Sequence, residues 1–436
     1  MRIRLTLGSA FLLLVLFAAT KTNPMPDAER HRPTAMPDRV VLTWAGDPAT
    51  TQAVTWRTSA TVDSAVAEIA IDEDGPAFVK KARSIAAVTG KLKSDLSEAH
   101  YHSVQFTGLT PGTQYVYRVG DGANWSEWNQ FRTTLDKPAP LTFLYLGDAQ
   151  NDIWSLWSRL ARTAWADVPK ADFVIHAGDL VNRSTKDAEW GEWHQAAGWI
   201  NRSRVSMPVP GNHEYNAPVA GAPRELTAHW RPQFTLPQNG IADLPESCFW
   251  YDVQGVRFVM LNSNTRQAEQ AAWLDSLLSK NPQRWTVLTF HHPVFSAAAN
   301  RDSKEWREAI QPVIDKHSVD LVLTGHDHTY ARSNLTSGLS GQSGKTVYVV
   351  SVSGPKMYNL DREPWMARAA EDTQLYQVIR IDGDRLRYES RTARGLLYDA
   401  FELKKRKGKA NELVNRIPPT PENRRSPAPP AAKKAA

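Results

Sequence analysis

The segment Phe173–Asn182, with the sequence FVIHAGDLVN, constrains the fold of this chain more than any other stretch. Its first residues form a short apolar run that stops at Gly178-Asp179, which is typical of a buried strand entering a tight loop. Open α/β sheets place their binding sites in such loops, at the carboxyl ends of the strands. A strand followed by Gly-Asp is also ordinary turn chemistry. The segment therefore predicts only that the Asp179 carboxylate lies at the edge of a sheet.

Four further apolar runs end in side chains that can bind metals. In three of them a glycine precedes the polar residue, and we expect these glycines to permit the sharp turn that each strand needs. Imidazole and carboxylate groups at converging loop ends suit Zn, Mn or Fe. Any one of these residues could be a hydrogen-bonded histidine in the core or an aspartate in a turn. Packing alone does not explain five strand ends with metal-binding side chains in one domain. The additional side chains are Asp148, Asn212 with His213, His291 with His292, and His326 with His328.

Two sequence patterns divide the chain. Residues 39–134 hold closely spaced β-branched and aromatic runs separated by turn residues, which predicts an all-β sandwich. After a Pro-containing joint at 135–140, short apolar runs alternate with helix-length segments, which predicts an α/β domain whose sheets are layered with helices. We therefore expect an all-β domain at 38–135 and an α/β domain at 141–400.

Both ends of the chain differ from the body. Residues 1–20 carry two arginines and an apolar run too short to span a bilayer. This pattern predicts a signal peptide, and hence a secreted or periplasmic protein without a transmembrane helix after signal removal; an uncleaved anchor is the alternative. Residues 21–37 are polar and predicted to be a linker. Residues 404–436 are basic and then Pro/Ala-rich, so we expect a disordered tail, either solvated or in contact with an anionic envelope surface.

The charge and the cysteine content exclude some classes of protein. The formal charge is +6, to which residues 1–23 contribute +3 and residues 404–436 contribute +8, leaving −5 for the body. A negatively charged body gives no support for nucleic-acid binding by the folded part. The single cysteine, Cys248, excludes an intramolecular disulfide and a thiolate metal site, and we expect it to be buried as a small apolar residue.

As an ordered set, the five strand ends resemble the calcineurin-like metallophosphoesterases, and within them the purple acid phosphatase-type enzymes. The resemblance covers roughly residues 37–400 and implies a fibronectin type III-like N-terminal domain, with 109–115 similar to a strand corner of such domains. Further sequence segments similar to this family lie at 233–237, 255–258 and 325–330. The motifs are Gly147-Asp148, Gly178-Asp179, Gly211-Asn212-His213-Glu214, His291-x-Pro293 and Gly325-His326-x-His328.

The resemblance implies a binuclear centre of two divalent or mixed-valence transition metal ions, with Zn, Mn and Fe as candidates. Asp179 would bridge the two ions, and His213 would be the catalytic histidine that orients the phosphoryl group or protonates the leaving oxygen. The implied reaction is hydrolysis of a small phosphorylated substrate, a phosphomonoester, by metal-bound hydroxide. One ion would take Asp148, Asp179 and His328, and the other Asp179, Asn212, His291 and His326.

Two positions depart from the family pattern. Asn182 stands where the purple enzymes have the tyrosine that binds ferric iron, and Gln150 stands where many other relatives have a second histidine. Either side chain could supply a neutral oxygen ligand, so a divalent pair without purple colour is favoured. A further histidine of the plant-type enzymes is not evident in 296–304. His292 or Arg301 could take its place as a substrate contact.

Two other functions remain open at the level of sequence. A phosphodiesterase that acts on nucleotides or phospholipid head groups would use the same metal core. Trp190, Trp193 and Trp199 have near-helical spacing that favours packing, although one of them could stack on an aryl or base group. A non-catalytic envelope-binding protein is the second alternative, and the complete ligand set argues against it.

Overall fold

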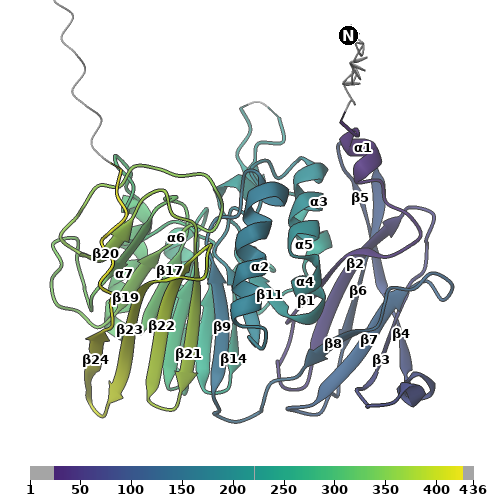
Figure 1. The fold of residues 1–436 in the computed structure, drawn as a ribbon, viewed down its shortest axis with the longest axis horizontal. Helices are drawn as coiled ribbons and strands as arrows, with labels where there is room; N and C mark the ends of the chain where they lie inside the picture. Colours follow the sequence, from purple (N-terminus) through teal and green to yellow (C-terminus); the bar gives the residue numbers. More distant parts are fainter. Residues whose placement is uncertain (1–23, 220, 426–436) are drawn as a thin grey trace, which may run out of the picture.

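The structure is a computed structural model that describes residues 24–219 and 221–425 (Figure 1). The segment expected to be a signal peptide, and residues 426–436 of the expected tail, lie outside these ranges. Within the described ranges, no helix combines the length and the apolar character that crossing a membrane requires.

The N-terminal part is β-rich, as predicted, and consists of two antiparallel sets of strands. Aromatic side chains fill the space between the two sets, since the ring of Phe106 on one set lies 6.2 Å from Tyr117 and 6.4 Å from Phe131 on the other. The likeness to fibronectin type III remains a prediction. One set is β1 (Asp38–Thr43), β2 (Gln52–Ser59), β6 (Glu98–Phe106) and β5 (Val88–Lys93), and the other is β4 (Arg83–Ala86), β3 (Val66–Ile71), β7 (Gln114–Gly120) and β8 (Asn129–Arg132).

The first set continues into the second half of the molecule as one eleven-stranded sheet, in the order β24-β23-β22-β21-β9-β10-β11-β1-β2-β6-β5. The join is a parallel pairing of β1 with β11 (Val205–Pro208), in register at Leu42 and Val205. A single buried apolar cluster accordingly extends from β1 to β23. The α/β part of this sheet adds β9 (Leu141–Leu146), β10 (Phe173–His176), β21 (Leu375–Asp382), β22 (Arg385–Thr392), β23 (Leu397–Arg406) and β24 (Lys409–Asn415).

A second, seven-stranded sheet packs on the first. The ring of Phe258 touches Phe143 and Phe173, each with ring centroids 5.2 Å apart. Helices α6 (Gln267–Ser279) and α7 (Lys304–His317) cover its other face. This sheet contains β14 (Phe249–Val253), β15 (Val256–Met260), β16 (Trp285–Thr289), β17 (Leu321–Thr324), β19 (Val347–Val350), β18 (Tyr330–Ser333) and β20 (Met366–Ala370).

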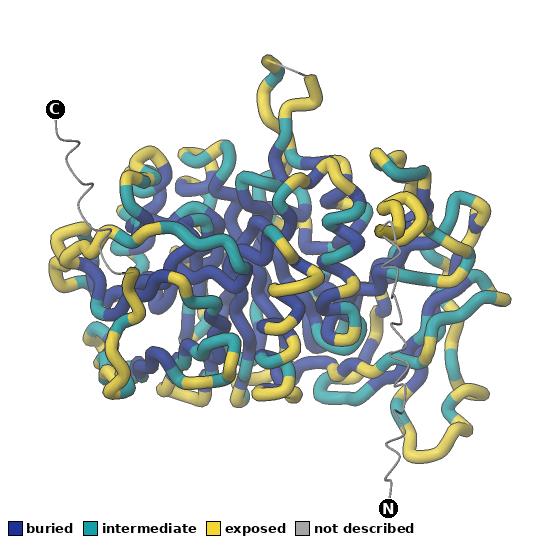
Figure 2. The backbone as a smooth tube through the Cα atoms, turned by 45° about the horizontal axis from the view of Figure 1, so that its top comes forward, coloured by how far each residue is buried: buried dark blue, intermediate teal, exposed yellow. Residues whose placement is uncertain are grey.

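The remaining elements surround these two sheets. Helices on the outer face of the first sheet complete the predicted layering of sheets with helices (Figure 1). Figure 2 shows buried residues in the centre of the molecule and exposed residues at the turns. These elements are α1 (Asp27–Arg30), η1 (Pro76–Lys81), the π-helix η2 (Ile153–Trp157), α2 (Ser158–Asp167), α3 (Asp187–Ala196), α4 (Gly198–Ser203), η3 (Asn212–Glu214), β12 (Tyr215–Asn216), β13 (Glu225–Leu226) and α5 (Trp230–Gln233).

The prediction of disorder from residue 404 is wrong as far as 425. Strands β23 and β24 form an edge hairpin that buries Leu403, while Lys405 and Asn411 both bond the buried carboxylate of Asp320. Composition could not show this, because the burial of Leu403 and the pairing of Lys405 with Asp320 depend on partners distant in the sequence. The expected linker also packs, since His31 is buried against Gly191.

Candidate metal centre

The Asp179 loop is held in a strained conformation by a buried carboxylate. Asp179 has φ of 49°, which a non-glycine residue adopts only with support from its surroundings. Glu214 supplies that support by accepting the backbone N–H groups of Asp179 (2.9 Å), Leu180 (2.9 Å) and Gly211 (2.7 Å). Burial, with the nearby Asp179 charge, raises the pKa of Glu214 to about 8. The sequence prediction gave Glu214 no role.

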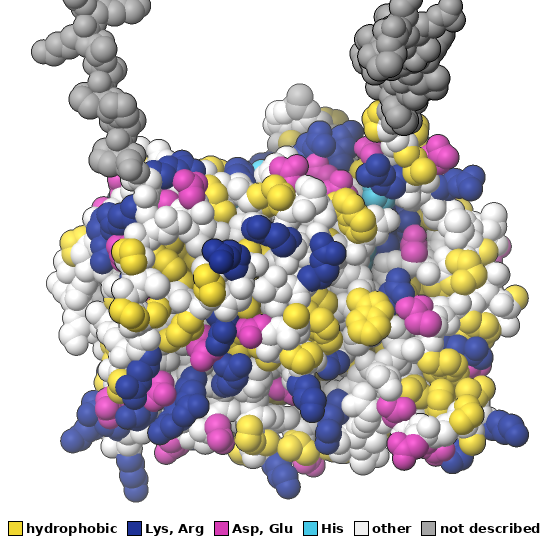
Figure 3. Space-filling model, in the orientation of Figure 1, with side chains coloured by type: hydrophobic (Ala, Val, Ile, Leu, Met, Phe, Trp, Pro, Cys, Tyr) yellow, Lys and Arg dark blue, Asp and Glu magenta, His cyan; other side chains and the backbone are white. Residues whose placement is uncertain are grey.

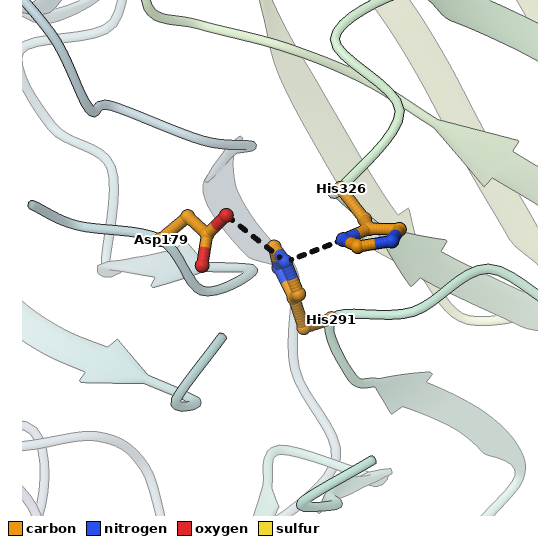
Figure 4. A group of neighbouring side chains, drawn as sticks. All are labelled: Asp179, His291 and His326. Atoms are coloured by element: carbon orange, nitrogen blue, oxygen red, sulfur yellow. Dashed lines mark hydrogen bonds and ion pairs between the residues drawn. The ribbon is translucent and has the colours of Figure 1, made fainter. Parts of the chain in front are cut away.

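Three other predicted ligands converge on one ring nitrogen of His291, and Figure 4 shows two of them, Asp179 and His326. His291 Nε2 lies 3.2 Å from Asp179 Oδ2, 3.1 Å from Asn212 Oδ1 and 3.1 Å from His326 Nδ1. The other nitrogen, Nδ1, lies 2.9 Å from the Ala177 carbonyl and donates to it. In the neutral ring, Nε2 then carries a lone pair, which faces the oxygens of Asp179 and Asn212. Such spacing suits ligands at about 2.0–2.2 Å from one cation.

A second group of ligands shares Asp179 with the first. His328 Nε2 lies 3.2 Å from Asp148 Oδ2, and the Gln150 amide lies 2.9 Å from both His328 Nε2 and Asp179 Oδ2. His328 Nδ1 donates to the Lys356 carbonyl at 3.1 Å, so the lone pair is on Nε2, which faces the Asp148 carboxylate and the Gln150 amide N–H. All six predicted ligands thus fall into two groups with Asp179 in common.

The electrostatics of these groups favour a cation. Burial raises the pKa of Asp148 to about 7, against the opposing effect of His291. Burial lowers the pKa of His328 to about 3 and that of His326 well below its ordinary value, so both rings are neutral and keep a lone pair. Asp148 Oδ2 and Gln150 Oε1 are buried without a hydrogen-bond partner. Unsatisfied buried acceptors are costly, and a transition metal ion would satisfy them.

His291 responds to the same negative field. Burial opposes charge on its ring, but the carboxylates of Asp179 and Asp148 outweigh burial and raise the pKa of His291 to about 9. The pKa of Asp179 is correspondingly lowered, because the His291 interaction outweighs burial. A positive charge among these residues is therefore stabilised, whether a proton or a metal ion carries it.

The glycines at the strand ends matter mainly because they leave space. Only Gly178 has a positive φ, 89°. At Gly211 a Cβ would overlap Asp179 Oδ1, at Gly325 it would overlap Asp148 Oδ1, and at Gly147 it would overlap the Ser351 carbonyl. The predicted need for backbone freedom is therefore wrong for these three positions, where the ligand carboxylates or a neighbouring strand approach too closely for any side chain.

His213 lies beside the groups without joining them. Its backbone N–H donates to Asp179 Oδ1 at 2.9 Å, and its Nδ1 lies 2.6 Å from the Asn182 carbonyl. The other ring nitrogen is 3.9 Å from Asp179 Oδ2, and the side chain is 26% exposed. One nitrogen is therefore fixed by the backbone, and the other remains available to a bound molecule.

The two departures from the family pattern lie in different places. The Gln150 amide reaches ligands of both groups. The Asn182 side chain instead lines a separate pocket with Trp154 and Glu192, while its backbone N–H bonds Glu189 at 2.8 Å. The structure thus brings Gln150 to the candidate centre and leaves Asn182 connected to it only through its carbonyl.

A pocket of about 580 Å³ opens beside the first group, the one around His291. His292 and His326 line it, with ring centroids 4.3 Å apart, and His292 Nδ1 bonds Ser263 Oγ at 2.8 Å. Arg301 contacts His326 Nε2. Arg224 lines the same pocket and was missed from the sequence, because nothing local to its loop indicates where the loop lies.

Comparisons with known proteins agree with this geometry. Residues 37–133 match the family model of the purple acid phosphatase N-terminal domain, and residues 141–330 match that of the calcineurin-like phosphoesterases. Probable purple acid phosphatase 20 of Arabidopsis thaliana is 26% identical over 265 residues, covering 56% of this chain and 60% of the relative. Human acid phosphatase type 7 is 26% identical over 353 residues, covering 74% and 76%.

Among solved structures, purple acid phosphatase PPD1 from yellow lupin seeds matches with a TM-score of 0.74 at 17% identity, covering 85% of this chain and 74% of that one. Residues 141–330 thus match a calcineurin-like phosphoesterase domain, which contains both candidate ligand groups. The chain as a whole is similar to purple acid phosphatases, as its motifs predicted. The chain spans 53–60% of the length of the first three curated relatives that it matches.

Proposed function

We propose that this protein is a binuclear metal-dependent phosphoesterase that hydrolyses phosphomonoesters. The observation that carries the proposal is the pair of ligand groups that share Asp179. Their mixture of imidazole, carboxylate and amide donors suits two divalent ions drawn from Zn, Mn and Fe. One ion would be held by Asp148, Asp179 and His328 with Gln150, and the other by Asp179, Asn212, His291 and His326.

A divalent pair is favoured over ferric iron. The position of the phenolate in the purple enzymes is occupied by Asn182, whose side chain lines a different pocket. The Gln150 side chain does reach the centre, where its amide N–H donates to Asp179 Oδ2 and lies 2.9 Å from His328 Nε2, and its neutral oxygen is buried without a partner. We therefore expect a colourless protein.

Two bound cations would supply Lewis acidity that activates water and offsets negative charge on the phosphoryl group. The ring of His213, held through Nδ1 on the Asn182 carbonyl, presents its other nitrogen for orienting that group or protonating the leaving oxygen. Arg224 adds positive charge along the pocket, Arg301 adds positive charge where it contacts His326, and His292 lies in the pocket wall. Glu214 acts indirectly, by fixing the loop that carries Asp179.

The apolar run in residues 1–20 supports export to a secreted or periplasmic location, where the protein would meet small phosphorylated substrates. Contact of the basic C-terminal residues with an anionic envelope surface also remains a proposal that rests on composition.

Metal reconstitution tests the proposed function. Purified protein is stripped of metal, loaded separately with Zn, Mn and Fe, and assayed on p-nitrophenyl phosphate and bis(p-nitrophenyl) phosphate. We expect two bound ions per chain and faster hydrolysis of the monoester. Faster hydrolysis of the diester would instead support the phosphodiesterase alternative. Less than one ion per chain, with neither ester cleaved, would contradict the proposal and favour a non-catalytic binding protein.

A further inference from the structure

A pocket of about 750 Å³ lies where the N-terminal strands meet helices α3 and α4. We call it the junction pocket, and its lining includes Arg39, Arg57, Trp154, His194, Gln195 and Trp199. None of the candidate metal ligands lines it. Figure 3 shows the hollow between the two parts of the molecule, with basic side chains and a histidine inside and hydrophobic side chains at its border.

The exposed tryptophans of the protein both line the junction pocket. Of the 16 tryptophans, all of which lie in the described ranges, only Trp154 and Trp199 are exposed, by 50% and 76% of their surface. Both line this pocket. Leaving an indole in water forgoes the free energy of its burial, so two in one pocket indicate flat apolar surfaces kept for a ligand.

The charged side chains in the floor are already neutralised. Arg39 donates to both carboxylate oxygens of Asp187, at 2.7 and 2.8 Å, and Arg57 donates to both oxygens of Asp38, at 2.7 and 2.9 Å. Within the described part of the chain, Arg30 at the rim is the one lining arginine without an ion pair. A strongly anionic ligand would find little free positive charge here, so the lining favours a neutral polar one.

The lining offers donors and acceptors side by side. His194 Nε2 bonds the Gln233 amide oxygen at 2.8 Å, and its Nδ1 is buried without a partner. Arg39 Nε is a buried donor that also lacks one. The Gln195 amide and the Asp38 carboxylate add further groups of both kinds. Hydroxyl groups, each of which donates and accepts, match such a mixture.

We propose that the junction pocket binds a neutral saccharide, with the apolar faces of its sugar rings against Trp154 and Trp199 and its hydroxyl groups bonded to the polar floor. A sugar ring combines an apolar face with a polar edge, and this pocket presents both features without free charge. The inference gives the protein a binding function that is independent of the metal centre.

Titration of the full chain with cellohexaose, chitohexaose and maltohexaose tests the proposal, with intrinsic tryptophan fluorescence and calorimetry as readouts. We expect at least one of them to bind, and Trp199→Ala to weaken binding by about tenfold or more, because tryptophan anchors dominate binding sites. Phosphatase activity of this variant should be unchanged. The control is Leu156→Ala, which removes a side chain that is 41% exposed near Trp154 but outside the pocket lining.

Three results would overturn the proposal. The first is the absence of binding by all three saccharides at millimolar concentration. The second is saccharide binding that survives both Trp154→Ala and Trp199→Ala. The third is binding of adenosine monophosphate that depends on Trp199 without any saccharide binding, which would identify a nucleotide pocket instead.

Discussion

The candidate metal centre and the junction between the two parts of the protein both bury charged side chains, but they satisfy them differently. At the junction, Arg39 and Asp187 are each 3% exposed and meet in a two-pronged ion pair. At the metal centre, Asp148 Oδ2 has no hydrogen-bond partner and faces a neutral imidazole at 3.2 Å. Paired buried charges hold a structure together, whereas acceptors that face one another await a cation. The difference between the two regions therefore lies in the buried carboxylate, which is paired at Asp187 and has an unpartnered oxygen at Asp148.

Removal of the shared ligand gives the largest expected effect. Asp179→Asn takes a carboxylate from both ligand groups, so we expect phosphatase turnover to fall by roughly three orders of magnitude or more. Circular dichroism should show an unchanged fold, and bound metal should decrease. Asp275→Asn, which alters an exposed carboxylate paired with Lys316, serves as the control. Near-normal turnover in Asp179→Asn would refute the two-metal proposal.

Substitutions at the junction should change the free energy of unfolding and leave the metal centre unaffected. Asp187→Ala leaves Arg39 buried without its partner, which we expect to lower the free energy of unfolding by about 3–5 kcal/mol. Asp38→Ala, which removes a carboxylate that is 41% exposed, should cost about 1 kcal/mol or less. Metal content per folded molecule should be normal in both variants. Equal losses of stability would show that burial of the pair does not matter.

The pH dependence of the stability lost in Asp187→Ala follows from the direction in which the pKa of Asp187 is shifted. Burial opposes the charge on Asp187, but Arg39 outweighs burial, so the pKa of Asp187 is lowered in the folded protein. The ion pair therefore contributes fully above the unfolded pKa of about 3.9, and its contribution is lost as the pH falls below that value. The difference in unfolding free energy between wild type and Asp187→Ala should be constant from neutral pH to about 5 and shrink in stronger acid.

A smaller effect separates the two side chains that depart from the family pattern. Gln150→Ala removes an amide that reaches both ligand groups, so we expect metal affinity to fall by about 10- to 100-fold. Asn182→Ala should leave metal affinity unchanged, because its side chain lines another pocket. Competition with a chromogenic chelator measures both. A larger loss in Asn182→Ala would show that its side chain turns toward the metals.

The smallest expected effect concerns the C-terminal segment. Arg425 pairs with Asp372 and bonds Asn359 at 2.7 Å, beside Tyr358, whose ring lies 4.7 Å from that of His328. Because the ion pair is 41% and 47% exposed, Arg425→Ala should lower the free energy of unfolding by at most about 1 kcal/mol. Arg424→Ala, which loses only contacts to Glu422, should cost still less in a denaturant titration.

The ligands of the candidate centre could be predicted from sequence because each directly follows a strand. Parallel strands in register bring such positions to one edge, as β9 and β10 do for Asp148 and Asp179. Gln150 and Asn182 were equivalent candidates in the sequence, and only the structure shows that the Gln150 amide contacts the ligands while Asn182 lines another pocket. Glu214 had a local signal, since a carboxylate in a glycine-flanked loop can accept the N–H groups of that loop.

The rest of the fold depended on partners distant in sequence. The strands of the body were predictable from their apolar runs, but β24 has few apolar residues and is ordered by pairing with β23. The exposure of Trp199 was likewise hidden, because its spacing matches that of the buried Trp190 and Trp193. Cys248 is buried, as expected for a single cysteine with no base partner evident in the sequence.

The pairing of β1 with β11 also determines when, during translation, the first sheet can form. Val205 follows its partner Leu42 by 163 positions, which a ribosome takes roughly 8–30 s to translate. During that interval the edge of β1 that will receive β11 has no partner, and unpaired strand edges are templates for aggregation. The N-terminal part therefore cannot complete its sheet until nearly half of the chain has been made.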